Sequence, residues 1–163
     1  MKLEIERKFL LKAMPDKAPS EIVKIDQWYW KNSKGVWERA RSWDSNINGV
    51  SWIHTIKKSV AKGINIEDEH NLTKEEYEFF TKRCNTPGED SKFISKERWI
   101  YPDGDLKWEV DLFKDNYHLI IAEIEIPTED YDLTLPDFIN KKSLLEVTGM
   151  KQFSNRSLSI KLN

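Results

Sequence analysis

The 163-residue sequence is poor in several residue types, and each scarcity excludes a class of protein. Cys84 is its single cysteine, which excludes an intrachain disulfide framework and a cysteine-rich zinc site. No run approaches the roughly 20 apolar residues of a membrane-spanning helix, and the charged N-terminal segment lacks the apolar core of a signal peptide. We therefore expect a cytoplasmic protein with no membrane partner.

An excess of one charge sign is also missing. The sequence has 26 Lys and Arg residues against 28 Asp and Glu residues, a formal net charge of −2 at pH 7. This balance does not favour nucleic acid as a partner, because proteins that bind its backbone usually carry a net basic surface. The chain is nevertheless 33% charged, and its 12% aromatic residues suffice for a packed core. Its length predicts a single domain over residues 1–163.

Alternation of apolar and polar residues with a period of two predicts β-strands along most of the chain. The predicted strands cover residues 2–11, 22–31, 36–43, 50–58, 64–70, 92–101, 105–113 and 118–126. Turn signals separate them, among them Asp115-Asn116 before the last strand. The sequence is therefore rich in strands.

Helices are predicted in fewer places. Thr73 and Glu76 have the spacing of a capping box, which predicts a helix that begins there and ends before Pro87. The C-terminal region is less regular, and we expect short helical pieces around residues 137–146 and 150–158.

Many of the predicted strands carry two like charges at positions i and i+2. Side chains two residues apart point to the same face, so each pair places like charges side by side, which destabilises a sheet unless a bound group compensates. The pairs are Glu4/Glu6, Arg39/Arg41, Glu67/Glu69, Lys96/Arg98, Glu109/Asp111 and Glu123/Glu125. The opposite strand faces are largely apolar, as Trp108 and Val110 illustrate.

Two interpretations of these pairs are open. One is the solvated face of an ordinary antiparallel sheet. The other is a concave sheet or barrel with a polar interior, in which carboxylates hold Mg²⁺ or Mn²⁺ and cationic side chains hold an oxyanion. A face that served solubility alone would mix both signs within each strand. We therefore favour the second interpretation, with a ligand of several linked phosphates.

The segment Glu4-Ile5-Glu6-Arg7-Lys8-Phe9-Leu10 resembles the ExExK signature of the CYTH, or triphosphate tunnel metalloenzyme, superfamily. Later motifs follow in the order typical of that superfamily, up to about residue 158. They are Arg39-x-Arg41, Thr55-Ile56-Lys57, Glu67-x-Glu69, Lys96-x-Arg98, Glu109-x-Asp111, Glu123-x-Glu125 and Thr148-Gly149-Met150-Lys151. The resemblance implies an α+β fold, an eight-stranded antiparallel β-barrel called the triphosphate tunnel, with helices packed outside.

The resemblance also implies roles for the charged residues. Triphosphate binding is expected of Lys8, Arg39, Arg41, Lys57, Lys96, Arg98 and Lys151. Binding of Mg²⁺ or Mn²⁺ is expected of Glu4, Glu6, Glu67, Glu69, Glu109, Asp111, Glu123 and Glu125. Catalytic roles are expected of Glu4, Glu6, Lys8 and Tyr29, the last because members often carry a tyrosine near the scissile phosphate.

Two positions depart from the pattern of the superfamily. Asn65 stands where members usually carry an arginine before the middle acidic pair. Gln152 stands where an arginine often follows the position of Lys151. Each change removes a potential charge-assisted phosphate contact worth about 1.5–3 kcal/mol, which is enough to alter the choice of substrate.

The function that the resemblance implies is metal-dependent hydrolysis of a linear triphosphate, with inorganic tripolyphosphate as the first candidate and thiamine triphosphate as the second. One alternative is a class IV adenylyl cyclase, which forms cyclic AMP from ATP in a similar tunnel. Another is a protein that binds a phosphorylated ligand without turning it over. An RNA 5′-triphosphatase is disfavoured by the balanced charge. The sequence leaves the oligomeric state open, and a homodimer is one expectation.

Overall fold

Antiparallel strands make up most of the protein. The computed structural model describes residues 1–115 and 118–162, so Asn116 of the expected turn lies outside the described residues. The strands are β1 (Lys2–Leu11), β2 (Glu21–Lys31), β3 (Trp37–Ser45), β4 (Gly49–Ala61), β5 (Ile64–Leu72), β6 (Ser91–Asp103), β7 (Leu106–Phe113), β8 (Ile120–Glu125), β9 (Ser143–Glu146) and β10 (Ile160–Leu162). The helices are α1 (Lys74–Cys84), α2 (Asp137–Asn140), α3 (Asn155–Leu158) and the 3-10 helix η1 (Lys151–Phe153).

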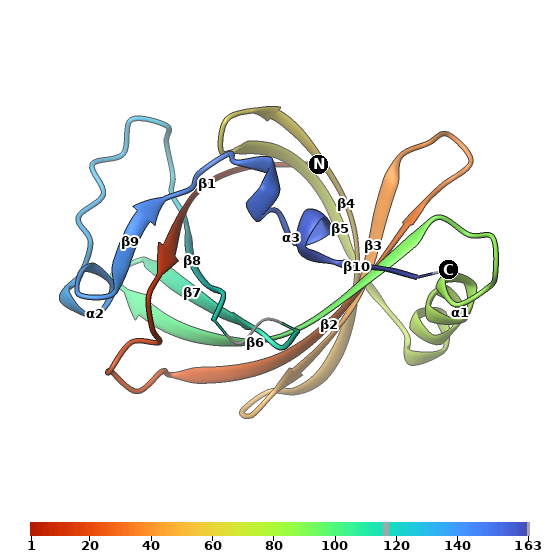
Figure 1. The fold of residues 1–163 in the computed structure, drawn as a ribbon, viewed down its shortest axis with the longest axis horizontal. Coiled ribbons are helices and arrows are strands. Elements are labelled where there is room, and N and C mark those ends of the chain that lie inside the picture. The colour runs from red at the N-terminus through yellow and green to blue at the C-terminus, as the bar shows by residue number, and fades with distance from the viewer. Residues whose placement is uncertain (116–117, 163) are drawn as a thin grey trace.

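Eight strands, β1 to β8, close into a barrel (Figure 1). Their order around the barrel is β6-β2-β3-β4-β5-β1-β8-β7, and β7 pairs back to β6. Closure leaves the ring without a free edge, which suits a sheet whose inner face carries charge. The predicted fold class, α+β with an eight-stranded antiparallel barrel, is confirmed.

Two short strands extend the sheet near the ends of the barrel. β9 pairs with residues 9–11 of β1, beyond the part of β1 that pairs with β5. β10 pairs with residues 91–93 of β6, beyond the part that pairs with β7. The helix expected over 137–146 is therefore wrong in its second half. Residues 143–146 form a strand because β1 offers them backbone groups that β5 leaves without a partner.

The largest apolar cluster lies on the outer face of the barrel. Phe9, Trp108 and Ile124 are buried there with Ile139 of α2. These residues alternate along their strands with the charged pairs, so the apolar and charged faces separate as the pattern predicts. In the described part of the chain, no helix is long and apolar enough to span a membrane.

Helix α1 covers another part of the outer face. Its predicted capping box is present: the Glu76 N–H donates to Thr73 Oγ1 at 3.1 Å, and the Thr73 N–H donates to Glu76 Oε1 at 2.9 Å. Tyr77, Phe80 and Cys84 then face a cluster on β2, β3 and β5. Because one helix face is apolar, docking on the barrel stabilises α1 more than its own propensity does.

The C-terminal segment differs from the expectation that helices lie outside the barrel. Phe153 and Leu158 pack against Tyr29, Ile94 and Phe113, which lie on the inner faces of their strands. Figure 1 shows α3 within the ring of strands, whereas α1 lies outside it. Apolar contacts therefore fill part of one end of the barrel.

Cys84 offers a test of how α1 packs. Its side chain is fully buried, and burial raises the pKa of the thiol to about 11. At pH 8 the thiol is therefore both covered and protonated, and thiolate is the reactive form. We expect the native protein to resist the thiol reagent DTNB at pH 8 under conditions that fully modify the denatured chain. Rapid stoichiometric modification of the native protein would contradict this packing.

Candidate active site

The charged pairs face the interior of the barrel, where opposite signs lie across from each other in the β4–β5 and β6–β7 pairs. Lys57 of β4 lies directly across from Glu67 of β5. Arg98 of β6 likewise lies across from Asp111 of β7. At these positions attraction between strands offsets the repulsion along each strand, whereas Glu6 lies across from Glu125 and Glu109 across from Glu123, so like charges also meet. The interior is polar, as the favoured interpretation requires.

Two cavities within the barrel bring most of the predicted residues together. The first lies at the end where α3 enters, and its lining includes Glu6, Lys8, Tyr29, Arg39, Lys57, Asn65, Asn155 and Arg156. The second is lined by a more acidic set that includes Glu4, Glu6, Arg39, Arg41, Lys57, Glu67, Glu69, Arg98, Glu109, Glu123 and Glu125. Because Glu6, Arg39 and Lys57 line both, the two cavities adjoin and share part of one wall, and together they make up the candidate site.

The backbone of β1 is held in place where it carries the first acidic residues. The Glu6 N–H donates to Gly63 O at 2.8 Å, and the Lys8 N–H donates to Thr148 Oγ1 at 2.9 Å. A Cβ atom on Gly63 would lie 2.7 Å from Glu6 O, and its φ of +72° is one that other residues rarely adopt. Gly63 therefore lets the β4–β5 turn approach β1 closely enough to fix Glu6.

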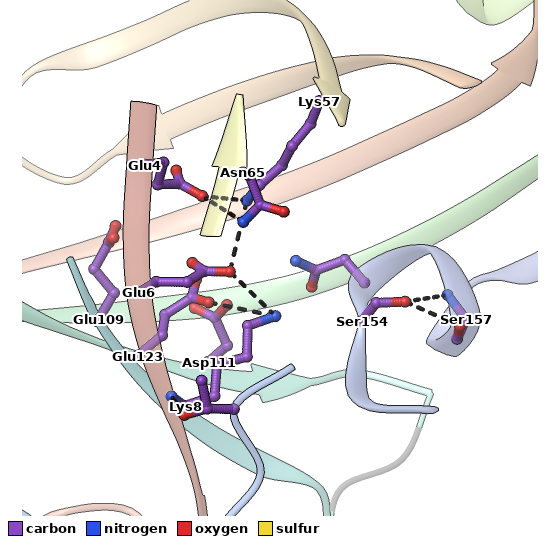
Figure 2. Close-up of polar contacts among 12 residues, drawn as sticks. Glu4, Glu6, Lys8, Lys57, Asn65, Glu109, Asp111, Glu123, Ser154 and Ser157 are labelled. Carbon is purple, nitrogen blue, oxygen red and sulfur yellow. Dashed lines mark hydrogen bonds and ion pairs between the residues drawn. The ribbon is translucent and has the colours of Figure 1, made fainter. Parts of the chain in front are cut away.

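A chain of alternating charges runs through Glu6. Lys57 Nζ lies 2.5 Å from Glu4 Oε1 and 3.7 Å from Glu6 Oε1. Lys8 Nζ lies 3.8 Å from Glu6 Oε1 and 3.7 Å from Glu123 Oε2. Figure 2 shows these side chains converging from β1, β4 and β8. Each lysine is thus shared between two carboxylates, and each pairing with Glu6 is longer than a direct hydrogen bond.

This crowding changes the acidity of Glu6. Burial, followed by the nearby charge of Glu123, raises the pKa of Glu6 to about 7, and the attraction of Lys57 and Lys8 offsets only part of that effect. Burial alone would lower the pKa of Lys57, but Glu6 and Glu4 raise it above its usual value. The site therefore holds more carboxylate charge than its own lysines neutralise.

The donor set of this cluster fits a divalent metal. Carboxylate oxygens are the ligands that Mg²⁺ and Mn²⁺ prefer, and a cation beside Glu4, Glu6 and Glu123 would relieve their mutual repulsion. Within residues 1–115 and 118–162, no three acidic or imidazole groups form a preassembled metal site. Lys57 and Lys8 occupy the positions between the carboxylates, so metal binding requires them to move.

Arg39 and Arg41 carry N–H groups that are available to donate hydrogen bonds to an anion. Among the described residues, neither buried Nε atom has a hydrogen-bond partner. Arg39 Nη2 donates to Thr55 Oγ1 at 3.1 Å, and Arg41 Nη2 lies 3.6 Å from Glu69 Oε2. Burial, together with repulsion from Arg39 and Arg98, lowers the pKa of Arg41 to about 10. Buried donors without partners are rare, and a bound oxyanion would satisfy them.

Two predicted binding residues lie behind the site rather than in its lining. Lys96 and Asp111 are 0% and 2% exposed. Lys96 Nζ donates to Asp111 Oδ2 at 2.7 Å, and Arg98 donates to both oxygens of Asp111 from Nε at 2.7 Å and Nη2 at 2.9 Å. Arg98 then reaches Glu109 and Glu123 at 2.6 and 2.8 Å. Asp111 is therefore placed to orient Arg98.

The pKa shifts of Asp111 and Lys96 indicate that this buried cluster stabilises the structure. Burial alone would raise the pKa of Asp111, but Arg98 and Lys96 outweigh it and hold that pKa well below the usual range. Burial lowers the pKa of Lys96 to about 8 despite the attraction of Asp111. At neutral pH the three side chains are therefore charged and mutually satisfied.

Tyr29 and Asn65 provide neutral groups in the first cavity. Tyr29 is 8% exposed, and its hydroxyl accepts a hydrogen bond from Gln27 Nε2 at 3.1 Å. Asn65 Nδ2 donates to Glu4 Oε1 at 3.4 Å. The position at which the sequence departs from the superfamily pattern is thus inside the site, with an amide in contact with a candidate metal ligand.

Lys151 lies outside both cavities. It is exposed on η1, and so is Gln152. Arg156 of α3 lines the first cavity instead, and Asn155 Oδ1 accepts a hydrogen bond from Lys96 Nζ at 3.0 Å. Asn155 and Arg156 were not among the predicted site residues, because no local pattern shows that the tail folds back into the barrel.

The fold and the interior together define a class of protein: a closed antiparallel barrel whose inner wall pairs carboxylates with lysines and arginines. Comparisons with known proteins narrow that class. An inorganic triphosphatase of Acetivibrio thermocellus is 31% identical over 158 residues, which cover 95% of this chain and 92% of that protein. No family model matches the sequence.

Solved structures share the fold. The inorganic triphosphatase NE1496 aligns with a TM-score of 0.59 at 23% identity, over 98% of this chain and 95% of that chain. A candidate adenylyl cyclase of Hippeastrum with a dominant triphosphatase activity aligns with a TM-score of 0.52 at 14% identity, over 77% and 80% of the two chains. The chain belongs to the CYTH, or triphosphate tunnel metalloenzyme, superfamily, as the motifs indicated.

The buried Asp111 cluster yields a stability prediction. Asp111→Asn leaves Lys96 and Arg98 buried without their shared carboxylate, and we expect it to reduce the free energy of unfolding by about 3–5 kcal/mol. Urea denaturation measures the change. Asp105→Asn, on the exposed β6–β7 turn, is the matched control and should stay within about 0.5 kcal/mol of wild type. Equal effects of the two substitutions would contradict the structural role of Asp111.

The raised pKa of Glu6 predicts how the stability of the metal-free protein depends on pH. In an unfolded chain the pKa of Glu is about 4.3. Stabilisation from the protonated Glu6 side chain is therefore fully present below that pH and is lost as the pH rises through about 7. Glu6→Gln keeps the neutral form, so we expect it to gain about 2–3 kcal/mol of unfolding free energy relative to wild type between pH 4.5 and pH 8 in EDTA.

Denaturation of both proteins at the two pH values measures that gain. Glu75→Gln, on the exposed face of α1, serves as the control and should show no comparable change. A difference between Glu6→Gln and wild type that is the same at both pH values would contradict the raised pKa.

Proposed function

We propose that this protein hydrolyses a linear triphosphate inside the barrel with the help of a divalent metal ion. Membership of the superfamily, with an inorganic triphosphatase as a relative, supports this activity. One observation carries the proposal: buried arginine donors without partners line the same interior as a crowded carboxylate cluster in which the pKa of Glu6 is raised. Such a site suits an anion and a metal cation at once.

Phosphate binding is assigned to Lys8, Arg39, Arg41, Lys57 and Arg98. The two arginines of β3 present the donors that lack partners, and guanidinium groups bind phosphate oxygens in pairs. Lys8 and Lys57 are now shared between carboxylates. When a triphosphate enters, its oxygens attract both lysines and leave the carboxylates free to bind metal. Lys96 is held by Asp111 and contributes positive electrostatic potential to the site without contacting phosphate.

Metal binding is assigned first to Glu4, Glu6 and Glu123, with Mg²⁺ or Mn²⁺ as the ion. A bound ion would neutralise phosphate charge and lower the pKa of a water molecule. The remaining acidic residues of the second cavity are candidates for a second ion or for orienting the water: Glu67, Glu69, Glu109 and Glu125. Lys8 and Arg39 stabilise charge on the phosphoryl group as it transfers, and Tyr29 can donate its hydroxyl to a phosphate oxygen.

The first candidate substrate is inorganic tripolyphosphate. A cyclase or a nucleotide-specific enzyme needs an aromatic surface for the base. Trp28 and Trp30 pack beneath α1 instead, and Trp28 Nε1 donates to Tyr77 Oη at 2.8 Å. Trp37 does line the first cavity, but three cations lie near its ring. These positions favour a substrate that consists of phosphate alone.

A substrate panel tests the proposal. We expect metal-loaded protein to release orthophosphate from tripolyphosphate faster than from thiamine triphosphate or ATP, and EDTA to abolish the activity. Glu4→Ala and Glu6→Ala should each lower kcat by about 10²–10³ or more, because each removes a metal-binding carboxylate. Glu75→Ala, on the exposed face of α1, should retain wild-type activity.

Two results would contradict the proposal. One is a pure, metal-replete protein that releases no phosphate from any linear triphosphate, which would leave binding without turnover. The other is formation of cyclic AMP as the main product from ATP.

A further inference from the structure

Trp43 of β3 lies against two arginines of the candidate site. The centroid of its ring is 5.0 Å from Arg41 Cζ and 5.7 Å from Arg98 Cζ. Both distances are within the range of about 6 Å over which a guanidinium group is attracted to the negative face of an aromatic ring, and this attraction is strongest for tryptophan. Trp43 also lines the second cavity, although the sequence assigned it no role in the site.

Strand alternation explains why this ring meets the site. Trp43 is two residues beyond Arg41, so both side chains point to the inner face of β3. Arg98 comes from β6, on the other side of β2. Between them β2 turns the branched side chains of Val23 and Ile25 to the same face, and Trp43 packs against the cluster that they form. Apolar contacts therefore support a ring that lies near both arginines.

Among the described residues, Arg41 has few other partners. Its Nη2 atom lies 3.6 Å from Glu69 Oε2, which is longer than a direct hydrogen bond, and its buried Nε atom has no hydrogen-bond partner there. The Glu69 side chain is also 36% exposed, so water weakens the attraction. The orientation of the Arg41 side chain therefore depends on the ring of Trp43 more than on an ion pair.

Arg98 differs, because carboxylates hold it from several sides. It donates four hydrogen bonds to three carboxylates of β7 and β8, at 2.6 to 2.9 Å. A fixed Arg98 repels Arg41: burial, followed by the charges of Arg39 and Arg98, lowers the pKa of Arg41 to about 10. The face of the Trp43 ring carries partial negative charge beside both guanidinium groups, so it opposes the repulsion that would move Arg41 away.

We propose that Trp43 is a positioning residue: its ring holds the guanidinium group of Arg41 in the orientation in which that group binds phosphate oxygens of the triphosphate. This inference rests on the proposed function and adds a residue to the binding of its substrate. Trp43 acts through Arg41 and not by contact with phosphate. The competing explanation is that Trp43 only fills the interior, as Val23 and Ile25 do. Substrate affinity would then not depend on whether the side chain at this position is aromatic.

Calorimetric titration of the full-length protein with a non-hydrolysable imido analogue of tripolyphosphate, in the presence of Mn²⁺, tests the inference without turnover. Trp43→Leu removes the ring, and we expect it to raise the Kd of the analogue about tenfold. Trp43→Phe keeps a weaker aromatic face on a side chain comparable in size to leucine, so its Kd should stay within about threefold of wild type. Trp43→Met replaces Trp43→Leu in this comparison if the latter does not fold, since methionine fills irregular gaps.

Two further variants separate positioning from packing. Trp28→Leu removes a ring of the same kind from the outer face, beneath α1, and should leave the Kd within about twofold of wild type. Arg41→Gln removes the group through which Trp43 acts. Trp43→Leu in the Arg41→Gln background should therefore change the Kd by less than about twofold, although each substitution alone weakens binding.

Steady-state kinetics provide a readout that loss of packing alone would not produce. Arg41 is assigned to phosphate binding, so we expect Trp43→Leu to raise KM for tripolyphosphate about tenfold and to change kcat by less than about threefold. Partial unfolding would instead lower the concentration of active protein, which reduces the apparent kcat and leaves KM unchanged.

Three results would overturn the inference. The first is a Kd that is the same for Trp43→Leu and Trp43→Phe, and the second is a double variant in which the effects of Trp43→Leu and Arg41→Gln multiply. The third is an analogue that does not bind wild-type protein, which would overturn the proposed function as well. If the analogue binds but no linear triphosphate is hydrolysed, the proposed function fails, and weaker binding that follows loss of the ring and depends on Arg41 would still support the role of Trp43.

Discussion

Like charges that adjoin along a strand need compensating charges from other strands of the inner wall, and the interior of the barrel is arranged around that requirement. Arg98 shows it most clearly, because it donates to Asp111, Glu109 and Glu123 across β7 and β8. Buried charges of this kind are tolerated only when they are paired and hydrogen-bonded. A closed barrel gives every strand two neighbours from which such partners can come, but it also places Glu6 across from Glu125 and Glu109 across from Glu123, so part of the carboxylate repulsion remains.

The polar interior determines where the apolar contacts lie. Most of the apolar packing is on the outer face, under α1 and α2, and this is consistent with a chain that is only 39% hydrophobic. The C-terminal segment is the exception, because Phe153 and Leu158 pack on inner-face residues at one end. The remaining interior combines buried arginine N–H groups, which can donate hydrogen bonds to an anion, with crowded carboxylates. The carboxylates that repel one another, and so destabilise the metal-free protein, are the same groups that the proposed function uses to bind metal.

Much of this arrangement could be predicted from the sequence, because strand alternation is a local property. The like-charge pairs identified the inner face, and Thr73 with Glu76 identified the start of α1. Local patterns could not predict how deeply each charged side chain is buried, or which distant segments pair with each other. Lys96 and Asp111 share a face with the cavity residues but are fully buried behind them. Residues 143–146 form a strand only because β1 has backbone left to pair, and Arg156 reaches the cavity only because the tail folds back.

The proposed function requires triphosphate and metal to bind cooperatively: phosphate oxygens pair with Lys8 and Lys57, and the carboxylates that these lysines release bind the metal. Titration of Mn²⁺ into the protein, with and without a non-hydrolysable imido analogue of tripolyphosphate, measures this cooperativity. The free Mn²⁺ concentration must be corrected for binding to the analogue alone. We expect the saturating analogue to raise the affinity of the protein for Mn²⁺ at least about tenfold, a coupling of ~1.4 kcal/mol. Equal affinities, or weaker Mn²⁺ binding in the presence of the analogue, would contradict it.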